Sequence, residues 1–398
     1  MVKDSNRLFF IDAMRAWAIL MMLQGHFIDG LLDTLFRDPE NIFYTTWKYF
    51  RGITAPVFFT VSGFIFTYLL IKAKDNGWQN PRVKKGIKRG LQLLLIGYLL
   101  RLNLFGLLVG EVYEGFYLVD VLHCIGLSLI SIIGIYLLTS KSNKFLFPSI
   151  LFFTTLILFL FEPYYKQWSF SFLPEIIANY FTKSNGSVFT IIPWLGYTTL
   201  GGFISILFSR FKNFNYFYPT AISLSIAIGL LLIFTSSDGF VFLFQQTGIQ
   251  LFQMIELNNY LFIRLGDVFL VFALFMIFRS FMTNKTILKV GANTLSIYVI
   301  HFVILYGSFT GLGLYRFFHH QLNPIVVIIG AIAFIFICTF LALQYAKHEY
   351  EIKSEISRAV LHLKLEVFSF QKSLTPKVKF YFSKARIYVA RFFRTVKN

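Results

Sequence analysis

The chain has 398 residues, of which 56% are hydrophobic and 14% are charged, and this balance excludes a soluble domain of its size. Its net charge of +18 does not require a nucleic acid as a partner, because the lysines and arginines gather in alternate connections between apolar stretches. The composition therefore predicts an all-α, polytopic membrane helix bundle.

Ten apolar stretches are long enough, at about 17 to 25 residues, to cross a membrane as helices. They are Leu8–Gly30, Gly52–Ile71, Gly90–Val109, Phe116–Leu138, Phe145–Phe161, Val188–Phe208, Tyr218–Thr235, Tyr260–Phe278, Thr294–Leu312 and Pro324–Tyr345. The two cysteines, Cys124 and Cys338, fall inside these stretches, so we expect neither a structural disulfide nor a metal site.

The connections between the stretches set the expected orientation, since short loops rich in lysine and arginine stay in the cytoplasm. The even-numbered connections are basic, whereas alternate ones carry acidic residues such as Glu111 and Glu256. Both termini should therefore be cytoplasmic. The stretch Phe240–Leu257 is apolar but interrupted by glutamines, and we interpret it as an interfacial or re-entrant helix on the outer side.

The sequence divides into two parts by composition. Residues 1–346 contain the predicted spans and form one membrane domain. Residues 347–398 are a basic cytoplasmic tail in which aromatic residues alternate with lysine and arginine, as in Lys377–Lys384. This pattern suits an amphipathic helix on anionic membrane lipids, and a disordered basic tail is the alternative.

The first stretch contains three ionisable residues, Asp12, Arg15 and His26, which are costly at membrane depth. Arg15 and His26 are eleven residues apart, so on a helix they share one face about 16 Å apart along the axis. With the amino terminus inside, this helix would line a passage from the cytoplasm towards His26. We expect these three residues to be catalytic.

Other polar residues fall at matching depths of later stretches and converge on the external half. We expect them to bind substrate: Arg51, Arg101, Asp120, His123, Arg264, Asp267 and His301. Each has a structural alternative. Pairs three residues apart, such as Arg264 and Asp267, would form local ion pairs, and His123 would hydrogen-bond Asp120 as a packing contact.

These residue types fit acyl transfer. An imidazole can take a proton from a hydroxyl or amine that attacks a thioester, or can carry the acyl group itself. Acyl-CoA would then be a cytoplasmic cosubstrate, with no permanently bound cofactor, and its phosphates would need cations such as Arg7, Arg15 or the cluster 82–89. A transporter or a flippase is the leading alternative, and a non-catalytic scaffold is the third.

Five segments in order along the chain resemble the transmembrane acyltransferases, the superfamily that joins the acyltransferase-3 proteins to the heparan-α-glucosaminide N-acetyltransferase group. The likeness extends from Arg7 to about Tyr345. The segments are Arg7–His26, Arg51–Gly63, Asp120–Gly126, Pro193–Gly196 and Asn293–His301.

The resemblance implies an enzyme of ten or eleven helices in a bacterial cytoplasmic membrane that moves an acetyl or other acyl group from cytoplasmic acyl-CoA to a sugar or glycan on the far side of the membrane. Whether this is O- or N-acylation, and whether the protein is a homo-oligomer, stays open. Position by position, Arg7, Asp12, Arg15 and His26 match the first-helix motif, and Arg51 matches the second. One departure is the absence of a His-x-x-Trp-x-Gly run between residues 33 and 51, so His26 is similar instead to the in-helix histidine of the acyltransferase-3 branch.

Overall fold

The computed structural model describes the backbone of residues 8–395 and most side chains up to Ser369. Its regular elements are all helices, and among the described residues the only β-type pairings are two isolated bridges. The chain divides into two compact units, Met1–Ala342 and Leu343–Asn398. The predicted all-α class is confirmed.

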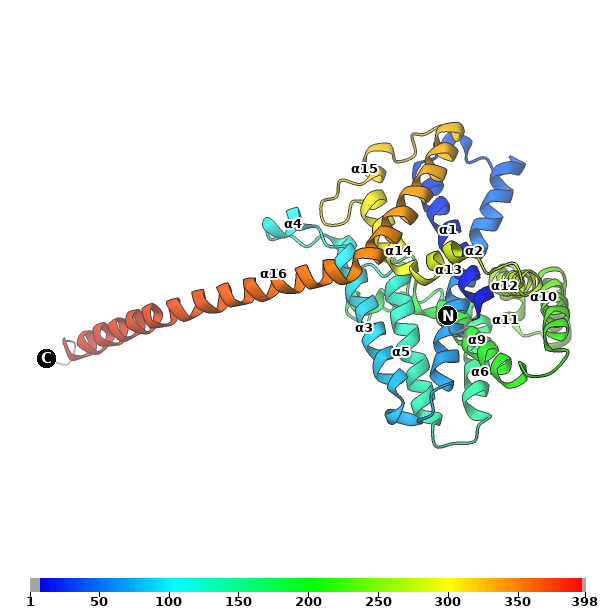
Figure 1. Cartoon of the computed structure of the whole chain (residues 1–398), viewed down its shortest axis with the longest axis horizontal. Coiled ribbons are helices and arrows are strands. Elements are labelled where there is room, and N and C mark those ends of the chain that lie inside the picture. Colours follow the sequence, from blue (N-terminus) through cyan, green and yellow to red (C-terminus); the bar gives the residue numbers. More distant parts are fainter. Residues whose placement is uncertain (1–7, 396–398) are drawn as a thin grey trace. The chain divides into compact units, whose positions relative to one another are not determined.

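The helices are labelled in Figure 1. The first half of the chain contains α1 (Phe9–Leu31), α2 (Ile42–Ile71), α3 (Pro81–Leu100), α4 (Leu104–Leu108), α5 (Val121–Thr139), α6 (Leu146–Leu160), α7 (Glu162–Tyr165) and α8 (Glu175–Ala178). The second half contains α9 (Ile191–Phe211), α10 (Phe217–Thr247), α11 (Gln250–Glu256), α12 (Tyr260–Ile277), α13 (Lys285–Ala292), α14 (Thr294–Tyr306), α15 (Leu314–Phe318) and α16 (Pro324–Thr395).

Six described segments are long and apolar enough to cross a membrane. They are α2, Gly115–Thr139 with α5, α9, α10, α12 and the first part of α16. The helices α13 and α14 meet at a bend of 70° and would together give a seventh crossing. The chain is a multi-pass membrane protein, while the count of ten crossings and the side of each terminus stay predictions.

Two helices begin earlier in the chain than the apolar stretches predicted, because capping residues fix their first turns. The Asn41 side chain accepts hydrogen bonds from the backbone N–H groups of Phe43 and Tyr44, at 3.0 and 3.1 Å, so α2 begins ten residues before the predicted Gly52. Asn80 caps α3 in the same way, and Pro81 stands at its first position. The predicted stretch Gly90–Val109 is therefore wrong in its bounds, because the helix starts at Pro81 and ends at Leu100.

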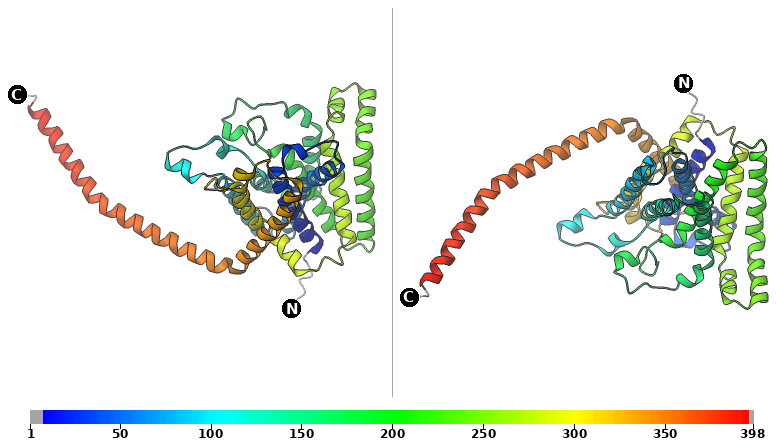
Figure 2. Two further views of the ribbon diagram at one scale, coloured as in Figure 1. Left: turned by 90° about the horizontal axis from the view of Figure 1, so that it is seen from above. Right: turned by 90° about the horizontal axis from the view of Figure 1, so that it is seen from below.

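The stretch Phe240–Leu257 is not one interfacial or re-entrant helix. Its first eight residues extend α10 to Thr247, and α11 is a separate short helix. The break falls at Gly248, whose φ of +67° suits glycine and closes the helix. Figure 2 shows α10 side by side with α12 at one edge of the first unit, and most α10 side chains are exposed.

Helix α2 is central to the first unit and packs most extensively against α9. The two backbones approach closely at glycines: a Cβ on Gly63 would lie 1.9 Å from the Thr198 carbonyl oxygen, and one on Gly201 would lie 1.8 Å from the Thr60 carbonyl oxygen. Small residues at such crossings are typical of helix pairs in membranes. This contact fixes the position of the α2 segment that lines the cavity described below.

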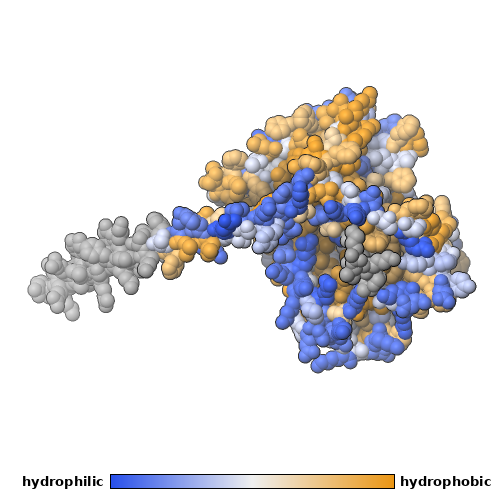
Figure 3. Space-filling model, viewed as in Figure 1, coloured by the Kyte–Doolittle hydropathy of each residue, from blue (hydrophilic) through white to orange (hydrophobic). Residues whose placement is uncertain are grey.

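The basic connections lie at one end of the helices. In Figure 3 apolar side chains cover much of the visible face, and hydrophilic ones gather at its lower end, where connections 72–80 and 140–145 lie. The expected lipid-binding side chains of Lys377–Lys384 lie outside the described part of the tail, whose backbone continues as α16.

Candidate active site

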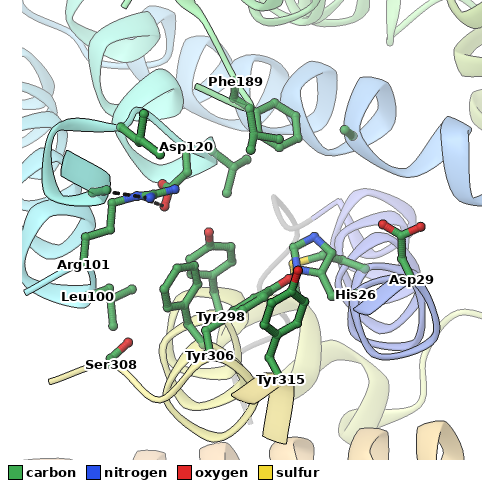
Figure 4. A pocket seen from close by; sticks show the side chains of 18 of the residues that line it. His26, Asp29, Leu100, Arg101, Asp120, Phe189, Tyr298, Tyr306, Ser308 and Tyr315 are labelled. Carbon is green, nitrogen blue, oxygen red and sulfur yellow. Dashed lines mark hydrogen bonds and ion pairs between the residues drawn. The ribbon is translucent and has the colours of Figure 1, made fainter. Parts of the chain in front are cut away.

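A cavity of about 850 Å³ lies between the helices of the first unit. Its lining comes from the second half of α1, the ends of α3 and α14, the loop that follows α14, and the amino-terminal parts of α2, α5 and α9. These helix ends are opposite to the basic connections 72–80, 140–145 and 212–216. In Figure 4, His26 lies on one side of the cavity and the pair Arg101–Asp120 on the other, with Tyr298 and Tyr306 between them.

His26 projects from α1 into this cavity and contacts two residues of α14. Its Nδ1 lies 3.4 Å from Nε2 of His301 and 3.3 Å from the hydroxyl oxygen of Tyr306. His301 is fully buried and does not line the cavity. Among the described residues none hydrogen-bonds to Nε2 of His26, which leaves this nitrogen available to a ligand.

Two arginine–aspartate pairs line the cavity, and Asp29 of the first pair also lies 3.8 Å from Nη1 of Arg37, which is outside the lining. Arg51 Nη2 lies 2.6 Å from Oδ2 of Asp29, one turn beyond His26 on α1. Arg101 Nε lies 3.3 Å from Oδ2 of Asp120, and its Nη1 donates to the Gly115 carbonyl oxygen at 3.0 Å. The charged residues of the lining therefore sum to zero, and both arginines, which were expected to bind substrate, are paired with carboxylates.

Asp120 also starts α5, and His123 belongs to this start rather than to the cavity. Asp120 and His123 form a capping box, in which the backbone N–H of Asp120 donates to Nδ1 of His123 at 3.3 Å. The His123 ring is fully buried against α3, where a Cβ on Gly97 would lie 2.5 Å from it. Its position matches the packing alternative rather than substrate binding.

Arg264 and Asp267 pair with each other beside the cavity lining. Arg264 Nη1 lies 2.8 Å from Asp267 Oδ2, and the Tyr49 hydroxyl donates to Asp267 Oδ1 at 2.7 Å. The Arg264 guanidinium also stacks over the Tyr49 ring, 4.3 Å from its centroid. This cluster joins α12 to α2 next to Gly52, which does line the cavity, so it supports the wall from behind.

Asp12 and Arg15 lie near the other end of α1, away from the cavity. Arg15 Nη1 is 3.8 Å from Asp12 Oδ1, and its Nη2 donates to Thr294 Oγ1 at 3.0 Å. The cavity lining on α1 begins at Met21, so the expected passage from Arg15 to His26 is not part of it. Arg7, the fourth residue of the expected first-helix motif, lies outside the described residues.

The aromatic wall of the cavity was not among the residues predicted from the sequence. Tyr298, Phe302 and Tyr306 recur every four residues on α14, and this helical spacing was the available signal. Tyr315 comes from α15, a helix of five residues that is too short to show a periodic pattern. Within the described residues, no group of three or more His, Cys, Asp and Glu side chains is placed to hold a metal ion.

A helical membrane protein with an unpaired imidazole nitrogen in a polar and aromatic cavity fits the class of membrane-embedded transferases. The chain belongs to the acyltransferase-3 family: the family's sequence profile, described as an acyltransferase domain, matches residues 8–343. It is thus a membrane acyltransferase, and the family does not favour the transporter or flippase alternative. No curated protein matches the chain.

Proposed function

We propose that the protein transfers an acetyl or other acyl group from acyl-CoA to a sugar or glycan in a bacterial inner membrane, with His26 as the general base. The observation that carries this proposal is the position of His26, whose ring lines a cavity of about 850 Å³ and whose Nε2 has no hydrogen-bond partner among the described residues. A base must reach the proton that it abstracts, and this nitrogen is open to the cavity.

The reaction balances with His26 as both acceptor and donor of one proton. Nε2 takes the proton of an acceptor hydroxyl or amine as its oxygen or nitrogen attacks the thioester carbonyl carbon. The tetrahedral intermediate then collapses, the carbon–sulfur bond breaks, and the imidazolium returns the proton to the leaving thiolate. The Tyr306 hydroxyl, beside His26, is placed to donate a hydrogen bond to the carbonyl oxygen as it gains charge.

The cavity favours an uncharged, hydroxyl-rich acceptor. Its two arginines are already neutralised by aspartates, so an additional anion would meet no unpaired cation among the described lining residues. Three buried lining atoms have no hydrogen-bond partner within the described part of the chain: Thr54 Oγ1, Trp194 Nε1 and Ser308 Oγ. Buried polar atoms are nearly always paired, and sugar hydroxyls would pair these while aromatic side chains cover the apolar ring faces.

Purified protein in detergent tests both the reaction and the acceptor class. We expect labelled acyl-CoA to acylate uncharged oligosaccharides without a sealed bilayer, and matched oligosaccharides with a uronate carboxylate to react at least about tenfold more slowly, because an unpaired buried charge costs more than 1.4 kcal/mol. Transport would instead need closed vesicles. Equal rates for the two acceptors would reject the neutral-acceptor assignment, and no transfer in detergent would reject the enzyme.

The donor is proposed to enter from the end of the molecule that carries Arg15 and the basic connections. There the CoA phosphates would meet Arg15 together with a net excess of lysine and arginine in connections such as 72–89, which the cavity lacks. Arg15→Gln should raise the KM for acyl-CoA about 10- to 100-fold, the value of a charged hydrogen bond. The measurement is initial rate against acyl-CoA concentration at saturating acceptor. Lys166→Gln, which changes an exposed lysine at the opposite end of α6 from the basic connection 140–145, is the control. An unchanged KM in the Arg15 variant would place the donor elsewhere.

A further inference from the structure

His301 contacts the proposed base but not the cavity. Its Nε2 lies 3.4 Å from His26 Nδ1, the two ring centroids are 5.3 Å apart, and the planes meet at 64°. The side chain is fully buried and absent from the lining. His301 therefore does not contact a substrate in the cavity. Any effect of His301 on the reaction is exerted through His26.

The surroundings of His301 decide which of its nitrogens carries the proton. His301 follows Ile297 and Tyr298 by one turn on α14, and in a helix the backbone carbonyl oxygens of the preceding turn point towards such a side chain. Its buried Nδ1 makes no hydrogen bond of normal geometry with the described residues, yet a lone pair directed at carbonyl oxygens would be repelled. The proton of neutral His301 therefore belongs on Nδ1, and Nε2 keeps the lone pair.

The tautomer of His301 then sets the tautomer of His26. Two lone pairs facing each other across 3.4 Å would repel, so His26 Nδ1 must carry a proton and donate it to His301 Nε2. The Tyr306 hydroxyl oxygen, at 3.3 Å, is a second acceptor for the same N–H group. Nε2 of His26 is left unprotonated towards the cavity, as a general base requires.

We propose that His301 is a positioning residue that holds His26 as its Nδ1–H tautomer, with a lone pair on Nε2. This inference rests on the proposed role of His26 in acyl transfer. Without a partner, a histidine side chain prefers the Nε2–H form in water, in which the nitrogen facing the cavity could not accept a proton. His301 would act as the orienting partner that makes the base competent.

The test is ¹⁵N NMR of histidine-labelled full-length protein in detergent, with the His26 signals identified by their loss in His26→Asn. In the wild type we expect a protonated, pyrrole-type Nδ1 and an unprotonated, pyridine-type Nε2 on His26. His301→Phe should convert His26 largely to the Nε2–H form, whereas Tyr306→Phe should leave the tautomer in place. A wild-type His26 protonated on Nε2, or an unchanged spectrum in His301→Phe, would overturn the proposal.

Kinetics give a second readout that simple destabilisation would not reproduce. His301→Phe should lower kcat about 10- to 100-fold, with the KM for acyl-CoA within twofold of wild type. His301→Gln, whose side-chain oxygen can stand near the original Nε2, should recover most of kcat. The control is His348→Phe, which replaces an exposed histidine of α16 and should change neither readout. A fall in kcat that His301→Gln does not recover contradicts the positioning role.

The two readouts separate this inference from the proposed function. The NMR result does not depend on turnover, so a wild-type protein with the expected tautomer but no acyl transfer would refute the function and leave the hydrogen bond established. An active enzyme in which His26 is the Nε2–H tautomer would refute the role of His301 and leave the proposed function standing.

Discussion

His26→Ala is expected to lower kcat for acyl transfer about 10²- to 10⁴-fold, the range that a positioned general base contributes. The KM for acyl-CoA should change little, because His26 lies eleven residues along α1 from Arg15, where the CoA phosphates are proposed to bind, and acts on the attacking group. Labelled acyl transfer by purified protein in detergent measures both constants. Wild-type activity in this variant would remove His26 from the reaction.

Chemical rescue, a control variant and a trapping experiment show whether the loss of activity in His26→Ala is due to the missing base. Imidazole added to His26→Ala should restore part of the activity, since the deleted ring borders a cavity of about 850 Å³ that can admit the small molecule. His348→Ala removes an exposed histidine and is the matched control. Rapid quenching of the wild type with labelled acyl-CoA and no acceptor distinguishes the base from an acyl carrier: a general base accumulates no labelled protein, whereas a carrier would trap acyl-histidine.

Helical geometry explains why part of the site could be predicted. The fixed rotation of about 100° per residue put Arg15 and His26 on one face of α1, of which His26 lines the cavity, and the depth of Arg101 and Asp120 in their stretches put them at the same end of the bundle. Depth alone could not show which residues meet. His123 and Arg264 share that depth, yet one packs against α3 and the other against Tyr49.

The ends of helices and the positions of residues between them could not be predicted from the apolar stretches alone. The starts of α2 and α3 depend on the hydrogen bonds of Asn41 and Asn80, which a hydropathy average does not register. Tyr315 reaches the cavity because the loop after α14 folds back, and this depends on long-range pairing such as that of Leu102 and Phe309. Such contacts between distant segments produce no repeating pattern in the sequence.

The contact between α2 and α9 carries the largest expected effect on stability. Gly201→Ala should destabilise the folded protein by about 3 kcal/mol or more, because its Cβ would lie 1.8 Å from the Thr60 carbonyl oxygen and backbone cannot move aside as a flexible side chain can. Gly63→Ala should act alike, with its Cβ 1.9 Å from the Thr198 carbonyl oxygen. Activity should fall as well, because α2 carries Arg51 and Thr54, and α9 carries Trp194.

The measurement is the melting temperature of purified protein in detergent, followed by intrinsic fluorescence, together with the monodisperse fraction in size-exclusion chromatography. Gly239→Ala is the matched control, since it makes the same chemical change on α10, where no atom lies within 4 Å of the added Cβ. Alanine favours a helix over glycine by about 1 kcal/mol, so the control should melt at or slightly above the wild-type temperature. Equal melting temperatures for Gly201→Ala and Gly239→Ala would contradict the close approach of the two helices, and with it the placement of Arg51 and Trp194 around one cavity.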